Sequence, residues 1–251
     1  MSEYRQVVSA IAPMTEEPSA GSTQVSQALA GHRLAVLEEQ APWLRVRSDD
    51  DYTGWVHEGY LAPTAATGSL GRRISLGCSV REAGNRRRDL PLRAYLPDDA
   101  VVEYGRFVTS AGLAGNFPRT AAGICASAMT LFDGAPYQWG GVTPWGADCS
   151  GFTQAIFGLH GVRLPRDSRD QADCGTEAGE RIEQTTPADL LFFSDREDSR
   201  ITHVAIALGE SRFAHVALGR GGFAIEDAAH RERDPYVKAL VGRFRFARHL
   251  L

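Results

Sequence analysis

The sequence lacks any long hydrophobic run. No stretch approaches the roughly 18 uninterrupted apolar residues that a membrane-spanning helix needs. The only apolar segment near the N-terminus, residues 7–12, is interrupted by Ser9 and stopped by Pro13, so it is too short and broken for a secretion signal. We therefore expect a cytoplasmic protein without a membrane span, although a secreted protein trimmed of its leader and given a new Met would read the same.

The sequence also lacks an excess of charge of one sign. Its 27 Lys and Arg and 31 Asp and Glu residues leave a formal net charge of −4, which offers no broad basic surface for a nucleic-acid backbone. The one arginine run, at 86–88, is predicted to be a solvated turn. With 43% hydrophobic and 23% charged residues, the composition predicts a folded globular protein that does not bind nucleic acid.

Cysteine is scarce, and its spacing excludes two common uses. The four cysteines form no C-x-x-C pair, so structural zinc and a disulfide framework are both poor interpretations; they are Cys78, Cys125, Cys149 and Cys174. The sequence also has no H-E-x-x-H pair, no G-x-G-x-x-G and no phosphate loop, so we expect no metal and no organic cofactor. The remaining question is whether one thiol is chemically special.

The N-terminal part of the chain is rich in short β-prone segments. Residues 33–38, 43–47 and 54–56 alternate apolar and polar side chains between turn residues, which predicts a small β-barrel over 1–63. The small residues at 62–68 predict a linker. Two further expected strands, at 73–77 and 90–96, indicate a second, reduced β module over 69–114.

The C-terminal part, 118–251, predicts an α+β domain. Helical periodicity begins near Pro118 and places Cys125 in the core, and a second amphipathic helix is expected from about Cys149 to His160, ended by Gly161. From Asp189 onward the pattern changes to five strands, at 190–193, 203–208, 212–217, 223–226 and 241–246. Helices followed by hairpin-connected strands indicate an antiparallel sheet.

Cys149 lies in the first turn of the second expected helix, with Asp148 in position to act as its N-cap. The positive end of a helix dipole stabilises a thiolate, so we expect a lowered pKa for Cys149 if the site is not apolar. Gly151 leaves the approach to the sulfur open. Cys149 is therefore a candidate nucleophile, and the alternative is a cysteine that only begins a buried helix.

Two histidines on neighbouring strands are candidates for the base that a thiol needs. If the two strands pair around a turn at 209–211, Ala205 faces His215, and His203 lies two residues along on the same face, about 7 to 8 Å away. A slip of one residue would put the rings on opposite faces. Each histidine alone is more simply a partly buried strand residue, but together with Cys149 they indicate a nucleophile, a base and an orienting group.

Five motifs in order resemble the NlpC/P60 family of cell-wall cysteine peptidases: YQWGG at 137–141, DCSGF at 148–152, LPRDS at 164–168, DLLFF at 189–193 and HVAI at 203–206. The resemblance covers about residues 118–251 and implies a papain-like fold. It also implies that Cys149 is the nucleophile, His203 the base and His215 the orienting residue. Residues 43–47 and 54–56 more weakly resemble bacterial SH3 (SH3b) modules, whereas the region 69–114 lacks their G-W signature.

The combination of these modules is similar to that of the γ-D-glutamyl-L-diamino acid endopeptidases, which recycle murein peptides and require a free L-Ala amine. By this resemblance Asp167 binds the amine and Ser150 and Tyr137 line the pocket. The loop at 49–55 implies Asp49 and Tyr52 at its closed end. A buried ammonium does need a carboxylate. Alternatively, Asp167 caps a short helix and residues 49–51 form a solvated turn.

The sequence thus predicts a cysteine peptidase that hydrolyses L-Ala-γ-D-Glu-diamino acid peptides after γ-D-Glu. One alternative is a non-catalytic module that binds cell-wall peptides, which would keep an unreactive Cys149. A second alternative is an acyltransferase of the same superfamily, which would need an open apolar groove; the polar Tyr137 and Asp167 count against it. Diaminopimelate or lysine at the third position, free peptide or intact wall, and the oligomeric state all stay open.

Overall fold

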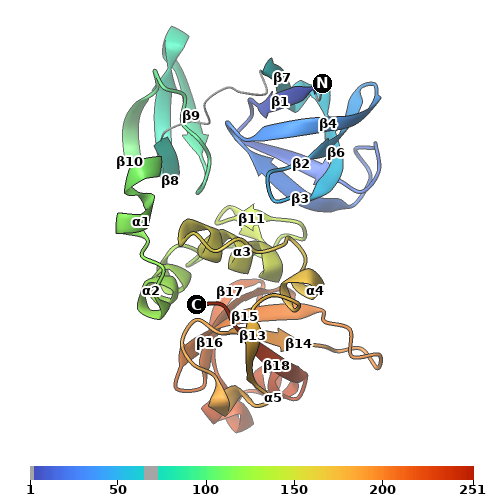
Figure 1. Ribbon diagram of the computed structural model, residues 1–251, viewed down its shortest axis with the longest axis vertical. Helices are drawn as coiled ribbons and strands as arrows, with labels where there is room; N and C mark the ends of the chain where they lie inside the picture. The colour runs from blue at the N-terminus through green and yellow to red at the C-terminus, as the bar shows by residue number, and fades with distance from the viewer. Residues whose placement is uncertain (1–2, 65–72) are drawn as a thin grey trace. The chain divides into compact units, whose positions relative to one another are not determined.

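The computed structural model describes residues 3–64 and 73–251, and the chain divides into two units (Figure 1). One unit comprises Met1–Asn116 and Trp139–Gly141, and the other comprises Phe117–Gln138 and Val142–Leu251. Within the described ranges, no helix has the length and apolar character needed to cross a bilayer.

The first sheet of the N-terminal unit confirms the predicted SH3-like module. Its seven antiparallel strands follow the order β3-β2-β6-β5-β4-β1-β7 and enclose a core that includes Met14, Leu34 and Val46. The strands are β1 (Tyr4–Val7), β2 (Ile11–Thr15), β3 (Gln24–Leu29), β4 (Arg33–Gln40), β5 (Trp43–Arg47), β6 (Thr53–His57) and β7 (Leu61–Thr64), with a 3₁₀ helix at Glu58–Tyr60. The predicted linker starts too early, because β7 pairs with β1 through Thr64; residues 65–68 lie outside the described residues.

A second sheet in this unit has three strands, in the order β10-β8-β9. They are β8 (Arg73–Glu82), β9 (Arg86–Leu90) and β10 (Val101–Thr109), with 3₁₀ helices at Ala83–Asn85 and Ser110–Gly112 and a one-turn helix α1 (Leu113–Asn116). The strand expected at 90–96 is wrong. Pro91 has no N–H to donate, and Arg93 has φ +73°, a left-handed conformation that interrupts the extended backbone at a non-glycine residue.

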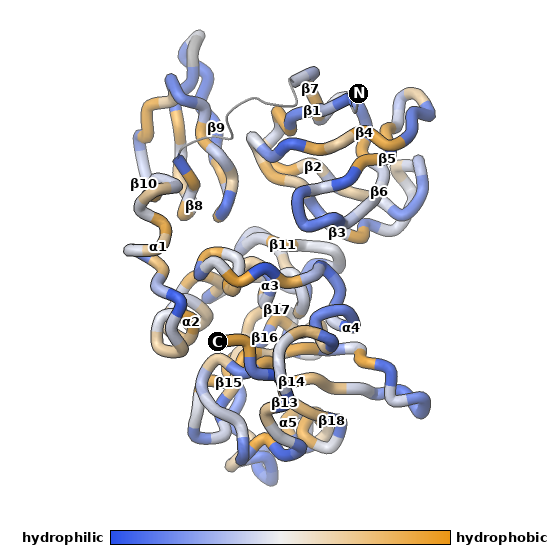
Figure 2. The backbone as a smooth tube through the Cα atoms, viewed as in Figure 1, coloured by the Kyte–Doolittle hydropathy of each residue, from blue (hydrophilic) through white to orange (hydrophobic). Residues whose placement is uncertain are grey.

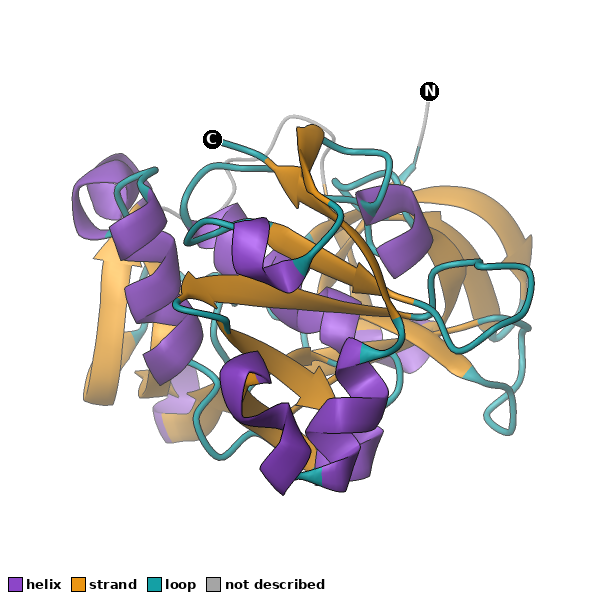
Figure 3. Ribbon diagram, turned by 90° about the horizontal axis from the view of Figure 1, so that it is seen from below, coloured by secondary structure: helices purple, strands orange, loops and turns teal. Residues whose placement is uncertain are grey.

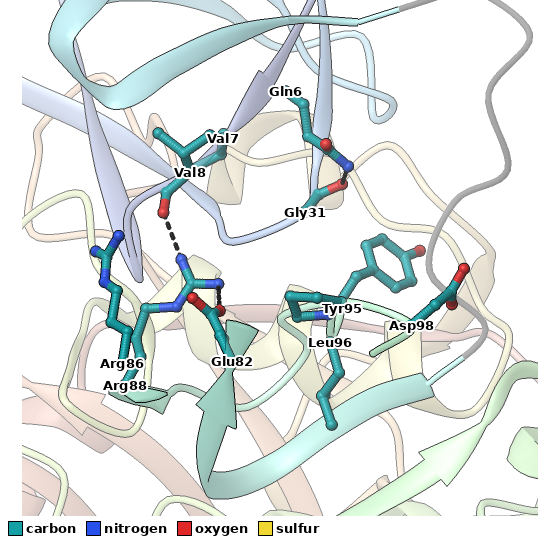
Figure 4. A pocket seen from close by; sticks show the side chains of 11 residues that line it. Gln6, Val7, Val8, Gly31, Glu82, Arg86, Arg88, Tyr95, Leu96 and Asp98 are labelled. Atoms are coloured by element: carbon teal, nitrogen blue, oxygen red, sulfur yellow. Dashed lines mark hydrogen bonds and ion pairs between the residues drawn. The ribbon is translucent and has the colours of Figure 1, made fainter. Parts of the chain in front are cut away.

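The arginine run at 86–88 is also not a turn, since it forms the first three of the five residues of β9. The Arg88 guanidinium donates to the Val8 carbonyl and pairs with Glu82, at one side of a cavity of about 450 Å³ in this unit (Figure 4). Tyr95 and Asp98 lie at the other side of the same cavity. Among the described residues that line this cavity, none is a predicted site residue.

The C-terminal unit is built on a six-stranded antiparallel sheet, in the order β13-β18-β14-β15-β16-β17. Its strands are β13 (Thr176–Gly179), β14 (Leu190–Phe193), β15 (His203–Gly209), β16 (Arg212–Ala217), β17 (Gly222–Asp227) and β18 (Phe244–His249). A separate small hairpin consists of β11 (Val142–Thr143) and β12 (Gly146–Ala147). The helices are α2 (Ala121–Thr130), α3 (Cys149–Leu159), α4 (Ser168–Gln171) and α5 (Pro235–Val241), with 3₁₀ helices at Ile182–Gln184, Leu218–Arg220 and Ala228–Arg233.

The core of this unit lies on both faces of the sheet. All four residues of β14 and the five central residues of β15 are buried, and these strands carry mostly hydrophobic residues (Figure 2). Seen from below, strands cross the middle of the unit and helical segments lie around them (Figure 3). The predicted α+β class with an antiparallel sheet is therefore confirmed.

Two predicted helices differ from the structure in detail. The first begins at Ala121 rather than Pro118, because the Thr120 hydroxyl accepts from the Gly123 amide and makes Thr120 the N-cap. The second, α3, is buried on nearly all sides rather than on one face. Its polar residues Thr153 and Gln154 can be buried because each makes a hydrogen bond inside the protein.

The loop before Tyr137 lies along one edge of the sheet. The Tyr137 amide donates to the Gly221 carbonyl and the Phe223 amide donates to the Ala135 carbonyl, each at 2.9 Å, so this loop extends the sheet beyond β17. A Cβ atom at Gly222 would lie 2.2 Å from the Ala135 carbonyl oxygen, so only glycine allows this approach. The strand β17 therefore fixes the position of the segment that leads to Tyr137.

Candidate active site

The first turn of α3 holds Cys149 at a capped helix N-terminus. Asp148 has an extended backbone, and its carboxylate accepts from the Gly151 amide at 2.8 Å, which confirms Asp148 as the N-cap. The polypeptide reaches this point from β12, which ends at Ala147. The thiol is therefore the first side chain of a helix whose start is fixed by a hydrogen bond.

A buried arginine holds the capping carboxylate from the other side. Arg166 is only 2% exposed, and its guanidinium binds both oxygens of Asp148, with Nη2–Oδ2 at 2.6 Å and Nη1–Oδ1 at 3.1 Å. Nη1 also donates to the Ser150 hydroxyl at 2.8 Å. The Ser150 hydroxyl thus belongs to this buried cluster, and any contact of Ser150 with substrate would have to come from its backbone.

The two candidate histidines meet directly. Nε2 of His203 and Nδ1 of His215 are 2.9 Å apart, and the rings are nearly perpendicular, at 75°. The pairing of Ile206 with Ala214 is the predicted register, but a bulge follows it, so that Gly209 rather than Leu208 pairs with Arg212. The turn residues Glu210 and Ser211 both have positive φ, which suits a tight hairpin.

The sulfur of Cys149 lies at the beginning of β15. A backbone hydrogen bond at Val204, the residue after His203, lowers the pKa of the Cys149 thiol, as does one at Ser150. The helix α3 packs on β15 and β16, so the thiol and the imidazole of His203 come from elements in contact. The structure therefore brings together the three residues predicted to act as nucleophile, base and orienting group.

The predicted fall in the pKa of Cys149 does not occur. Cys149 is partly exposed as a residue, yet burial of its sulfur, followed by the nearby Asp148 charge, raises the thiol pKa to about 12. Burial also lowers the pKa of His203 well below 6.5, with a further contribution from His215. Desolvation exceeds the helix-dipole effect here, so the protein holds a neutral Cys149 thiol and a neutral His203 imidazole.

This charge state predicts how the thiol reacts with an alkylating agent. The rate of Cys149 carboxamidomethylation by iodoacetamide should keep rising with pH from 6 to 10, because the thiolate fraction grows throughout that range when the pKa is near 12. Peptide mapping by mass spectrometry separates Cys149 from the other thiols. A rate that reaches its plateau below pH 8 would instead indicate a preformed thiolate.

Tyr137 lies close enough to Cys149 for the charge of the thiolate to affect the pKa of the phenol. Burial, then the charges of Cys149 and Asp148, raise the pKa of Tyr137 to about 12. Its backbone is held beside Ala147 by a parallel bridge. A phenol that keeps its proton at neutral pH is a hydrogen-bond donor, so Tyr137 can stabilise negative charge that develops on a carbonyl oxygen near the sulfur.

Asp167 follows Arg166 and precedes α4. It occupies the N-cap position of α4, yet its side chain makes no capping hydrogen bond to this helix. Burial raises the pKa of Asp167, partly offset by Arg166. The fully buried Gln171 of α4 donates to the Ser150 carbonyl at 3.1 Å and accepts from the Thr153 hydroxyl at 2.7 Å. Asp167 is thereby connected to α3 through the short helix that it precedes.

The other two predicted substrate-binding residues lie in the N-terminal unit. Asp49 lies near enough to Arg93 and His32 that its charge raises the pKa of both, against the stronger lowering by burial. Tyr52 packs against the core of the first sheet, and its carbonyl accepts from the Ser48 amide at 3.0 Å. Their contact with substrate stays a prediction. Among residues 3–64 and 73–251, no group of three or more His, Cys, Asp or Glu side chains is arranged to hold a metal.

Sequence reasoning missed two charged residues of the site, Arg166 and Glu226. Arg166 lies inside the LPRDS motif, but only its neighbour Asp167 was singled out. Glu226 is 5% exposed and lies 3.3 Å from Nε2 of His215. Arg166 lies in the loop before α4 and Glu226 lies on β17, and at neither position does the local pattern indicate that a charged side chain points inward.

A thiol at the start of a helix, packed against a strand that carries one of two hydrogen-bonded histidines, is the arrangement of the papain-like hydrolases. The comparisons with known proteins agree: the model of the NlpC/P60 family matches residues 134–240, and that of a bacterial SH3 domain matches residues 16–62. The chain belongs to the NlpC/P60 family of peptidases, with an SH3-like N-terminal module.

Two similar proteins are both named gamma-D-glutamyl-L-lysine dipeptidyl-peptidase. The Bacillus subtilis protein is 30% identical over 213 residues, which cover 76% of this chain and 71% of that protein. The Bacillus cereus protein is 28% identical over 226 residues, covering 76% and 66%. The crystal structure of an NlpC/P60 family protein from Bacillus cereus covers 99% of both chains, with a TM-score of 0.78 at 18% identity, and so shares the fold.

Proposed function

We propose that this protein is a cysteine peptidase that hydrolyses murein peptides between γ-D-Glu and a diamino acid and prefers a free N-terminal L-Ala. The observation that carries the proposal is the joint position of Cys149 at the start of α3, beside β15, and of His203 in hydrogen-bond contact with His215. The names of the two Bacillus relatives support the bond that is cut.

In the proposed reaction the sulfur of Cys149 attacks the carbonyl carbon of γ-D-Glu while His203 takes the thiol proton. Tyr137 and the backbone amide of Ser150, which both lie near the sulfur, can donate to the oxyanion that forms. As the intermediate collapses, the C–N bond breaks and His203 returns the proton to the departing amine. Water then attacks the thioester, again with His203 as base, and releases L-Ala-γ-D-Glu and the free thiol.

The pKa values fit this order of proton transfer. Because the resting thiol and imidazole are both neutral, the proton moves from sulfur to nitrogen during attack rather than before it. A base whose pKa is lowered below 6.5 stays unprotonated throughout the neutral range. His203 is therefore available as an acceptor whenever substrate arrives.

The direct test is incubation of the purified protein with two tripeptides, L-Ala-γ-D-Glu-diaminopimelate and L-Ala-γ-D-Glu-L-Lys. Mass spectrometry should detect L-Ala-γ-D-Glu released from at least one of them. Release from neither would overturn the proposal. Binding of the peptides without turnover would instead identify a cell-wall peptide-binding module.

The preference for a free amine leads to a second prediction, at Asp167. Replacing Asp167 with asparagine should raise KM for the free tripeptide by about 10- to 100-fold, because a charge-assisted hydrogen bond to the ammonium is lost. The same substitution should leave the slow cleavage of the N-acetylated tripeptide nearly unchanged, since that substrate carries no ammonium. Equal losses on the two peptides would show that Asp167 does not bind the amine.

A further inference from the structure

A buried carboxylate lies behind the histidine pair. Glu226 of β17 is 5% exposed, and its Oε1 is 3.3 Å from Nε2 of His215, which is itself fully buried on β16. The Nδ1 atom of the same ring is 2.9 Å from Nε2 of His203. Both nitrogens of His215 are thus occupied, one by a carboxylate and the other by the candidate base.

Glu226 is held in place by a cation. Arg220 binds both carboxylate oxygens, with Nε–Oε1 at 2.6 Å and Nη2–Oε2 at 3.0 Å, and its guanidinium also pairs with Asp234. It lies over the ring of Tyr236, 4.3 Å from the ring centre. Asp234 in turn caps α5 by accepting from the Tyr236 amide at 2.8 Å. These contacts fix the direction in which the carboxylate faces His215.

The ionisation of Glu226 determines which nitrogen of His215 carries a proton. Burial would raise the pKa of Glu226, but hydrogen bonds from His215 and Arg220 hold it below its usual value. An ionised carboxylate can only accept hydrogen bonds, so Nε2 of His215 must be a donor. A neutral His215 is enough to make this bond, because Arg220 binds both oxygens of Glu226 and supplies a countercharge to the carboxylate.

The same argument applies to the ring of His203. With its proton on Nε2, a neutral His215 presents a bare Nδ1, which accepts from Nε2–H of His203. His203 then has its proton on Nε2 and a lone pair on Nδ1. We propose that Glu226 is a positioning residue that sets this direction of hydrogen bonding, and thereby keeps Nδ1 of His203 free to accept the proton of Cys149.

This proposal rests on the proposed function only in naming Cys149 as the group whose proton His203 accepts. The direction of the hydrogen bonds can be measured without substrate, so the first test does not need it. In wild-type protein with ¹⁵N-labelled histidine, NMR should find the proton of His215 on Nε2 and that of His203 on Nε2. A proton on Nδ1 of His215 would overturn the proposal, whether or not the protein cleaves peptides.

The second test is Glu226→Gln, which keeps the shape but replaces an acceptor-only carboxylate with an amide that can donate to Nε2 of His215 as well as accept from it. We expect a measurable share of both rings to change to the Nδ1-protonated tautomer and kcat to fall about 10-fold with little change in KM, as when a buried partner no longer fixes the correct tautomer. The rate of Cys149 alkylation should fall as well. Glu232→Gln, at an exposed carboxylate paired with Lys238, is the matched control and should leave all three readouts unchanged.

Two results of the substitution would contradict the proposal: unchanged tautomers in Glu226→Gln, or a kcat above half the wild-type value. Thermal unfolding of the variant shows whether the unit still folds. If it does not, the tautomers of the wild-type protein still decide the question. If wild type cleaves no peptide while its tautomers are as expected, the proposed function is wrong. The role of Glu226 in directing these hydrogen bonds is then still supported.

Discussion

Replacing Cys149 with alanine should abolish cleavage of the tripeptide, with a loss of about 10⁵- to 10⁶-fold in kcat. The expected size follows from the loss of covalent catalysis, since removal of a nucleophile from a comparable triad costs about 2 × 10⁶-fold. Discontinuous assays with mass-spectrometric detection of L-Ala-γ-D-Glu can measure a loss of this size.

Cys174→Ala is a matched control, because Cys174 is a partly exposed free thiol outside the described site. It should keep wild-type activity, which separates loss of the nucleophile from general effects of removing a thiol. Undiminished cleavage by Cys149→Ala would exclude the mechanism, even if the tripeptide proves to be a good substrate.

The second large effect is expected on stability, at Arg166. Replacing Arg166 with methionine leaves the buried carboxylate of Asp148 without its cation, which costs about 3 to 5 kcal/mol. For a protein of this size, that corresponds to a fall in Tm of roughly 6 to 20 °C. Differential scanning calorimetry measures it directly, on the transition of the C-terminal unit.

The control for this change is Arg196→Met. Arg196 pairs with Asp198, but both side chains are more than half exposed, and a surface pair of this kind contributes about 0 to 1 kcal/mol. If Arg166→Met lowers the stability no more than Arg196→Met does, water must reach Asp148 and replace the guanidinium, which would contradict the prediction. The double variant Arg166→Met, Asp148→Asn should recover part of the lost stability, because it removes the uncompensated charge.

The positions of Cys149, His203 and His215 could be predicted because local sequence determines them. The N-cap residue Asp148 fixes where α3 begins, and a short turn fixes which residues of β15 and β16 face each other. Even the bulge near Gly209 leaves the two histidines on one face, since it lies between them and the turn.

What the sequence did not predict depends on tertiary burial. Charged residues usually lie at the surface, so nothing in the local pattern marks Arg166 or Glu226 as buried. The predicted direction of the Cys149 pKa shift was wrong for the same reason. The helix dipole can be inferred from the sequence, whereas the desolvation that exceeds its effect cannot. The wrong strand at 90–96 reflects the left-handed backbone of Arg93, a conformation that few non-glycine residues adopt.

The loop that leads to Tyr137 lies against β17, which is one of the two edge strands of its sheet. An uncovered outer strand offers unpaired amides and carbonyls to other chains and invites self-association. Here the segment that carries a residue of the site also shields that strand near Gly222. Resistance to aggregation and placement of the phenol therefore depend on the same few hydrogen bonds, so a substitution that detaches this loop would endanger solubility and turnover together.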